Sequence, residues 1–131
     1  MSKTWADIKY FKAVEFDSPD KQGSGYMMNL DFVAKLDAVR EACKESLTIN
    51  SGYRTPEHNA TVNGVDSSSH SSGHAADIRT LSSATRCKVL EAAFRLGFRR
   101  VGIGKTFVHL DDDLTKPQDV VWTYPDSAKR A

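Results

Sequence analysis

The sequence predicts an α+β fold in which a small, mostly antiparallel sheet packs against two main helices. Apolar residues recur at helical spacing over residues 29–46 and 82–97. Two strand-like segments, 99–104 and 107–112, are separated by only two residues, which is typical of an antiparallel hairpin. We expect residues 1–131 to form a single domain, because a chain of this length fits one hydrophobic core.

In the first half of the chain, residues 4–10 predict a short helix, followed by a turn at 18–20 and a loop over 20–27. Asn29 is a suitable N-cap for the first long helix, which we expect to end near Ser46. Its predicted buried face consists of Leu30, Val33, Leu36, Val39 and Cys43.

Residues 47–51 have the β-branched content of a short strand. A long stretch, 52–73, then contains many Gly, Ser and Asn residues, and an irregular segment of that length inside a domain is often functional. Residues 74–80 predict a second strand. The chain resumes as a helix from Ser82 or Ser83.

The second long helix carries Cys87, Leu90, Ala93 and Phe94 on its predicted apolar face, and Gly97 is expected to end it in a left-handed conformation. Both cysteines are therefore expected to be buried thiols in helices. After the hairpin 99–112, with Lys105 and Thr106 at its tip, residues 120–124 predict a last strand before a polar tail. The arginines 95, 99 and 100 are expected to form a solvated face.

The composition is that of a folded protein, with 40% hydrophobic residues, 27% charged residues and a net charge of +1. A balanced charge gives no broad attraction to nucleic acid or to anionic membranes, so we expect neither partner, and we expect a monomer. No segment approaches the roughly 20 apolar residues of a membrane-spanning helix, and the N-terminus lacks a signal-peptide pattern. We expect synthesis in the cytoplasm and retention there unless another route exports the chain.

His70, Asp77 and His109 form a candidate metal site. Two imidazoles and a carboxylate can bind Zn²⁺ and leave the fourth tetrahedral position open, as catalytic zinc sites do. The small residues Gly73 and Ala75 would let the backbone approach the metal. From residue type and spacing alone, the alternative that His70 is a solvated loop residue stays open.

Three sequence blocks resemble the zinc D,D-carboxypeptidases and endopeptidases of the M15 family, which are related to the hedgehog-type zinc fold. Residues 68–77 are similar to the family signature S-x-H-x-x-G-x-A-x-D, and residues 49–59 are similar to its S-G-Y-R block. Residues 100–111 resemble its closing strand pair, which ends in H-x-D. The resemblance extends from about residue 11 to 112 and is closest to the small, phage-type members.

The resemblance implies that His70, Asp77 and His109 bind Zn²⁺. It also implies that Arg54 holds the substrate carbonyl or carboxylate and stabilises negative charge that develops on it. Ser68 either binds the substrate peptide or only shapes the turn before His70.

The general base is where the sequence departs from the family. Thr106 stands where many members have an acidic residue, and Phe107 stands where others have histidine. Side chains alternate along a strand, so Asp111 should lie on the same face as His109 and is the best replacement. The alternative is a carboxylate that only orients a ligand. Asp112 and Asp113 are expected to be solvated.

The resemblance implies a zinc metallopeptidase, a D,D-carboxypeptidase or endopeptidase, that hydrolyses peptidoglycan stem peptides or cross-links at D-alanine-containing bonds. Such an enzyme would act on the cell wall after release from the cytoplasm, as a bacteriophage endolysin or virion enzyme does. The alternative is a non-catalytic module of the same fold that binds zinc and the cell wall. The missing acid at Thr106 favours this alternative, whereas Arg54 and Asp111 favour the enzyme.

Overall fold

The computed structural model describes residues 3–65 and 67–125, and it contains a five-stranded sheet with two main helices. The predicted α+β fold class is therefore confirmed. The strands are β1 (Ile49–Ser51), β2 (Ala75–Arg79), β3 (Arg100–Ile103), β4 (Phe107–Asp111) and β5 (Val120–Thr123). The helices are α1 (Leu30–Cys43), α2 (Pro56–Thr61) and α3 (Ser83–Arg95), and three 3₁₀ turns precede them at Trp5–Asp7, Ala13–Phe16 and Ser24–Met27.

The strands lie in the order β1-β2-β4-β3-β5. Every neighbouring pair is antiparallel except β3 and β5, which are parallel. The β3–β4 hairpin turns at Lys105 and Thr106 as predicted, because the Gly104 amide donates to the Phe107 carbonyl at 2.9 Å. Strands β2 and β4, at the second and third places of the sheet, are therefore adjacent inner strands.

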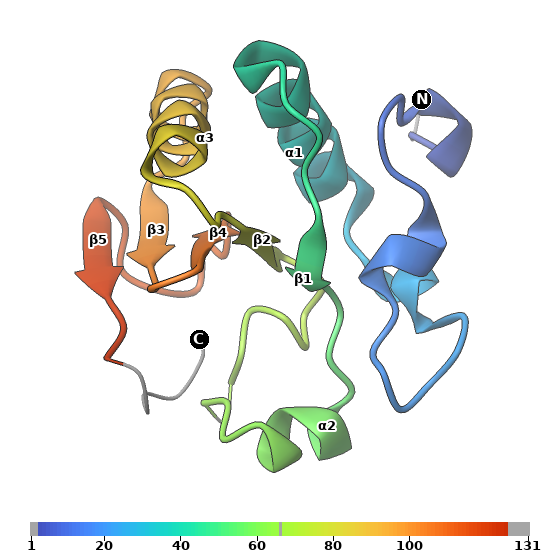
Figure 1. The fold of residues 1–131 in the computed structure, drawn as a ribbon. Helices are drawn as coiled ribbons and strands as arrows, with labels where there is room; N and C mark the ends of the chain where they lie inside the picture. The colour runs from blue at the N-terminus through green and yellow to red at the C-terminus, as the bar shows by residue number, and fades with distance from the viewer. Residues whose placement is uncertain (1–2, 66, 126–131) are drawn as a thin grey trace.

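The two faces of the sheet have different surroundings. Helices α1 and α3 cover one face, whereas the segment that carries α2 lies on the other side (Figure 1). Alternation along the strands sends one set of side chains into the core beneath the helices. This set contains Ala76, Ile78, Val101, Val108 and Leu110. Residues at the intervening positions of the same strands face away from the helices.

Helix α1 begins and ends through local capping. The Asn29 side chain accepts from the Phe32 amide at 3.0 Å, as predicted for an N-cap. The helix stops at Cys43 rather than near Ser46, because Lys44 takes a left-handed conformation with φ of 56°. Its fully buried residues Phe32, Val33, Leu36 and Val39 each contribute about 1.5–3 kcal/mol by leaving water.

Helix α3 has the predicted ends but not the whole predicted face. Gly97 follows it with φ of 90°, as expected. Leu90 and Ala93 pack inward together with Val89 and Ala92, whereas Cys87 and Phe94 are exposed. The prediction for Cys87 and Phe94 was wrong, because packing on α1 selects a stripe centred on Val89 and Ala93.

The helix predicted over residues 4–10 was also wrong and is reduced to the 3₁₀ turn Trp5–Asp7. The amides of Lys9 and Tyr10 donate to the Asp37 carboxylate of α1 at 2.8 Å each. These contacts hold residues 9–10 outside a helix, and a helix of that length is marginal by itself.

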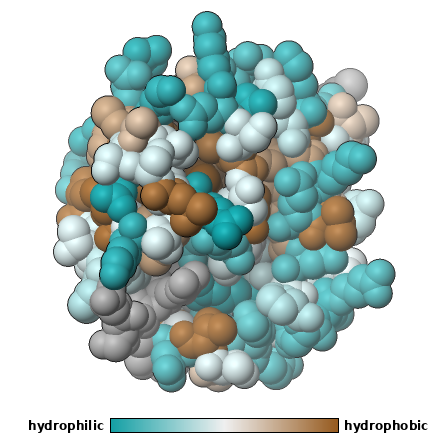
Figure 2. Space-filling view, viewed as in Figure 1, coloured by the Kyte–Doolittle hydropathy of each residue, from teal (hydrophilic) through white to brown (hydrophobic). Residues whose placement is uncertain are grey.

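The polar tail expected after Tyr124 lies almost entirely in residues 126–131, outside the described residues. In the space-filling view, hydrophobic residues of the described part gather only in small separate patches on a mostly hydrophilic face (Figure 2). Among the described residues, no helix combines the length and apolar character that crossing a membrane requires.

Candidate metal centre

His70, Asp77 and His109 converge on the face of the sheet away from α1 and α3. One potential ligand atom from each residue lies within 4.8 Å of the other two. Asp77 and His109 are paired residues of β2 and β4, so their side chains stand side by side. His70 reaches the same point from the irregular segment before β2. The structure thus brings together all three residues that the sequence singled out as ligands.

The distances from Asp77 to the two histidines are close to those between ligands of one zinc ion. Asp77 Oδ1 lies 3.3 Å from His70 Nε2 and 3.0 Å from His109 Nδ1. Tetrahedral zinc with bonds of about 2.0–2.1 Å separates its ligand atoms by about 3.3–3.4 Å. All three residues have 0% exposure. The cluster therefore offers one ligand atom from each residue to a single ion.

The outer nitrogen of each imidazole is held by an acceptor. His70 Nδ1 donates to the Gly52 carbonyl at 2.8 Å, which leaves Nε2 unprotonated and turned toward Asp77. His109 Nε2 lies 2.7 Å from Asp111 Oδ2, with Nδ1 turned toward Asp77. Metal-binding histidines are normally oriented by such contacts to their other nitrogen. Both rings are therefore prepared to present a lone pair to the same cation.

His70 Nε2 is a buried polar atom that makes no hydrogen bond with any described residue. Its 3.3 Å approach to Asp77 lacks hydrogen-bond geometry, because neither atom carries a proton when Nδ1 is the protonated nitrogen. A buried acceptor without a partner is unfavourable, and a cation between His70 and Asp77 would remove that penalty.

The charges of the site depend on one another. Burial favours the neutral carboxyl of Asp77, but the electrostatic influence of His70 and the hydrogen bond with His109 outweigh it and hold the Asp77 pKa far below its usual range. Burial lowers the pKa of His70. It also acts to lower the pKa of His109, but contacts with Asp111 and Asp77 raise that pKa overall. Without metal, His109 therefore holds its proton more strongly than a free imidazole does.

Arg54 lies behind Asp77 and has only 1% of its side chain exposed. Its guanidinium donates to Ser51 Oγ at 3.0 Å, to Asn59 Oδ1 at 3.2 Å and to Asp77 Oδ2 at 3.3 Å. Because Arg54 takes Oδ2, the other oxygen of Asp77 is directed at the two histidines. The sequence predicted a contact of Arg54 with substrate, whereas the structure shows a contact with a candidate ligand.

Asp111 shares a face with His109, as the alternation predicted. Both carboxylate oxygens are engaged: Oδ2 with His109, and Oδ1 with the Arg100 Nε at 2.7 Å and the Asp113 amide at 3.1 Å. Asp111 therefore contacts the nitrogen of His109 that points away from Asp77. This arrangement is that of a carboxylate that orients a ligand, the alternative that the sequence left open.

The turn before His70 is fixed locally. Ser68 Oγ accepts from the His70 amide at 3.1 Å, so this hydroxyl shapes the turn. Gly73 has φ of 80°, and a Cβ there would lie 2.6 Å from the Met27 carbonyl oxygen. Position 73 thus requires glycine because of its own positive φ and because the chain before α1 passes close to it, not because of the metal.

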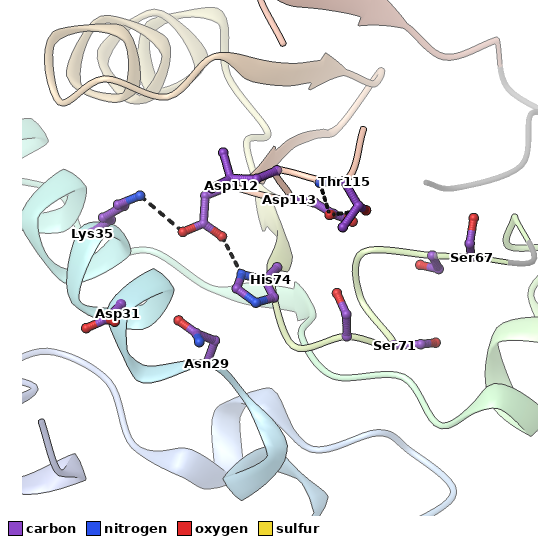
Figure 3. A pocket seen from close by; sticks show the side chains of 12 residues that line it. Asn29, Asp31, Lys35, Ser67, Ser71, His74, Asp112, Asp113 and Thr115 are labelled. Atoms are coloured by element: carbon purple, nitrogen blue, oxygen red, sulfur yellow. Dashed lines mark hydrogen bonds and ion pairs between the residues drawn. The ribbon is translucent and has the colours of Figure 1, made fainter. Parts of the chain in front are cut away.

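A pocket of about 820 Å³ lies beside this turn and includes Ser68 in its wall. In Figure 3, Asp112 lies between His74 and Lys35, so a carboxylate meets an imidazole and an ammonium group there. Its oxygens lie 2.7 Å from His74 Nδ1 and 3.1 Å from Lys35 Nζ. The expectation that Asp112 and Asp113 are solvated was wrong. Asp112 is 15% exposed at its side chain, and Asp113 is buried and accepts from Ser69 Oγ at 2.7 Å.

Two residues of the centre were missed by the sequence reasoning. The Gly52 carbonyl could not be foreseen, because any residue has a carbonyl. Arg100 was assigned to a solvated face but is buried against Asp111. A signal existed for it: a two-residue turn at 105–106 places residue 100 opposite residue 111.

A family model described as Peptidase M15 matches residues 9–111. The matched range contains the three candidate ligands and both residues that hold their outer nitrogens. No curated protein matches the chain.

Proposed function

Because the chain belongs to the Peptidase M15 family, we propose that it is a zinc peptidase that hydrolyses peptidoglycan stem peptides or cross-links at D-alanine-containing bonds. Membership of the family implies a metallopeptidase with a peptide substrate. The observation that carries the assignment of the site is the pair of imidazoles at Asp77, each with its outer nitrogen held by an acceptor. The particular bond and the cell-wall substrate are part of the proposal.

His70, Asp77 and His109 would hold the ion. Zinc bound there would supply the Lewis acidity that polarises a peptide carbonyl and makes water nucleophilic near neutral pH. Arg54 would keep Asp77 directed at the histidines through Oδ2. Because Arg54 is buried, we assign it an effect on catalysis through Asp77 rather than through direct contact with substrate.

The remaining residues would orient ligands and receive the peptide. Asp111 would hold the ring of His109 in place through Nε2. Ser68 would stabilise the turn that presents His70 and, as part of the pocket wall, would border the bound peptide. The proposal places the activity at the cell wall after release from the cytoplasm, as in phage lysis or entry, on the strength of the sequence resemblance.

The experiment is digestion of purified peptidoglycan with the zinc-loaded protein, followed by mass spectrometry of the released muropeptides. The native protein is expected to release peptides or free D-alanine, and the masses identify the bond. His109→Ala is expected to abolish release, whereas His58→Ala, a half-buried histidine outside the three-residue cluster, is expected to keep it. Equal activity of the native protein and His109→Ala would refute the proposed mechanism.

A second candidate function is supported by the complete burial of the three ligands. Each has 0% exposure, as in a structural zinc site, and Thr106 replaces the acid found in many family members. A non-catalytic module of this kind would bind zinc and sediment with peptidoglycan but release no peptide from it. The same digestion, combined with a sedimentation assay, separates the two functions.

A further inference from the structure

We propose that Arg100 is a positioning residue of the metal centre, which fixes His109 by holding the carboxylate of Asp111. The inference rests on the proposed function, since it concerns the affinity of the site for zinc. It assigns a task to a side chain that contacts none of the three candidate ligands and that the sequence placed on a solvated face.

The position of Arg100 follows from the register of the β3–β4 hairpin. Arg100 pairs with Asp111, and Gly102 pairs with His109, so arginine and carboxylate lie side by side on the face of the metal centre. The side chain of Arg100 is 7% exposed, whereas that of the neighbouring Arg99 is 58% exposed. The pleat of β3 thus sends these two adjacent arginines into different surroundings.

The guanidinium of Arg100 is itself held on several sides. Nε donates to Asp111 Oδ1 at 2.7 Å, and NH1 donates to the Pro117 carbonyl at 2.7 Å. The guanidinium carbon lies 5.0 Å from the centre of the Trp122 ring on β5, within the range of a cation–π contact. A group anchored at three places is a rigid support for the carboxylate that it contacts.

Asp111 transmits this support to His109. Its second oxygen lies 2.7 Å from His109 Nε2, while the Trp122 ring lies 5.4 Å from the His109 ring. A hydrogen bond from Nε2–H to Asp111 leaves the Nδ1 lone pair toward Asp77. Loss of Arg100 would free Asp111 to rotate, and His109 would lose the contact that selects its orientation.

The test is the zinc affinity of the full chain, measured by competition with a chelator of known affinity. Asp111→Asn is expected to weaken zinc binding by about 10–100-fold, the usual effect of losing an outer partner of a ligand, and Arg100→Gln, one contact further away, by about 10-fold. The matched control Arg99→Gln removes an exposed partner of Asp119 and is expected to stay within about two-fold of the native affinity. The absorption spectrum of the Co²⁺-loaded protein should change only for the variant at position 100.

A double-variant cycle distinguishes positioning from general support of the fold. If Arg100 acts through Asp111, Arg100→Gln should add little to the loss already caused by Asp111→Asn. A purely structural role predicts instead that the two losses multiply, or that only the unfolding temperature of the chelated protein falls. If Arg100→Gln does not fold, Arg100→Lys carries the test, because its single ammonium cannot reproduce the planar fork that contacts Asp111 and Pro117.

Native-like zinc affinity of Arg100→Gln, or of Arg100→Lys where the first variant does not fold, would overturn the inference. In that case the native protein still binds zinc and hydrolyses its substrate, so the proposed function stands. A native chain that binds no zinc would overturn both.

Discussion

Asp77→Ala is expected to lower the free energy of unfolding of the metal-free protein by about 3–5 kcal/mol, because it breaks a buried ion-pair network. The Asp77 carboxylate, at 0% exposure, lies 3.0 Å from His109 Nδ1, 3.3 Å from His70 Nε2 and 3.3 Å from Arg54 NH2. No water can replace these contacts at a fully buried position without opening the structure. Folded domains are stable by about 5–15 kcal/mol, so such a loss is a large part of the total.

Asp112→Ala is the matched control for this substitution. Asp112 also contacts a histidine and a cation, His74 at 2.7 Å and Lys35 at 3.1 Å. Its partners are 33% and 51% exposed at their side chains, so solvent screens the pairs and the expected loss is about 0–1 kcal/mol. Urea unfolding of both variants in the presence of a chelator measures the difference. Equal losses would refute the argument that burial makes the Asp77 network strong.

Two further predictions concern pH and backbone conformation. Because His109 has a raised pKa in the folded protein, the stability that its proton contributes is complete below the unfolded value of about 6.5 and is lost as the pH rises through the folded pKa. Urea unfolding of the chelated protein should therefore show a falling free energy of unfolding as the pH rises through this range. Zinc affinity should rise over the same range, because zinc binding displaces that proton. A free energy of unfolding of the metal-free protein that rises with pH would contradict this. Gly73→Ala should lower the free energy of unfolding by about 1–3 kcal/mol, and by more than Gly97→Ala. Both glycines have positive φ, but only a Cβ at position 73 would meet backbone, 2.6 Å from the Met27 carbonyl oxygen. Thermal unfolding compares the two variants, and equal losses would show that the close approach has no effect.

The fold class and the three metal-site candidates could be predicted because their signals are local or shared with a family. The two-residue turn at Lys105 and Thr106 predicted the antiparallel pairing of the strands around it. The residue spacing from 68 to 77 matched the family signature. From residue type alone, His70 could equally have been a solvated histidine. Its burial depends on how the segment 52–73 folds back over the sheet, which no local pattern specifies.

The surroundings of the ligands were harder to predict because they depend on contacts between distant segments. Arg54 has the length to reach a substrate or Asp77, and only the fold decides that it meets Asp77. Arg100 is charged and follows another arginine, which indicates an exposed side chain. The hairpin register instead places it opposite Asp111. On α3, two overlapping stripes of apolar residues were possible, and contact with α1 selected the one that excludes Cys87.

The three candidate ligands do not sit on equally rigid parts of the chain. Asp77 and His109 lie on adjacent inner strands, so two of the three candidate ligands are in place whenever the sheet is formed. The third, His70, lies on the segment 52–73, in whose described residues α2 is the only helix or strand. A bound ion would hold that segment against the sheet. Metal binding would therefore hold residues 52–73 in place. Removal of the metal should increase amide hydrogen exchange in this segment first, well before exchange in the strands increases.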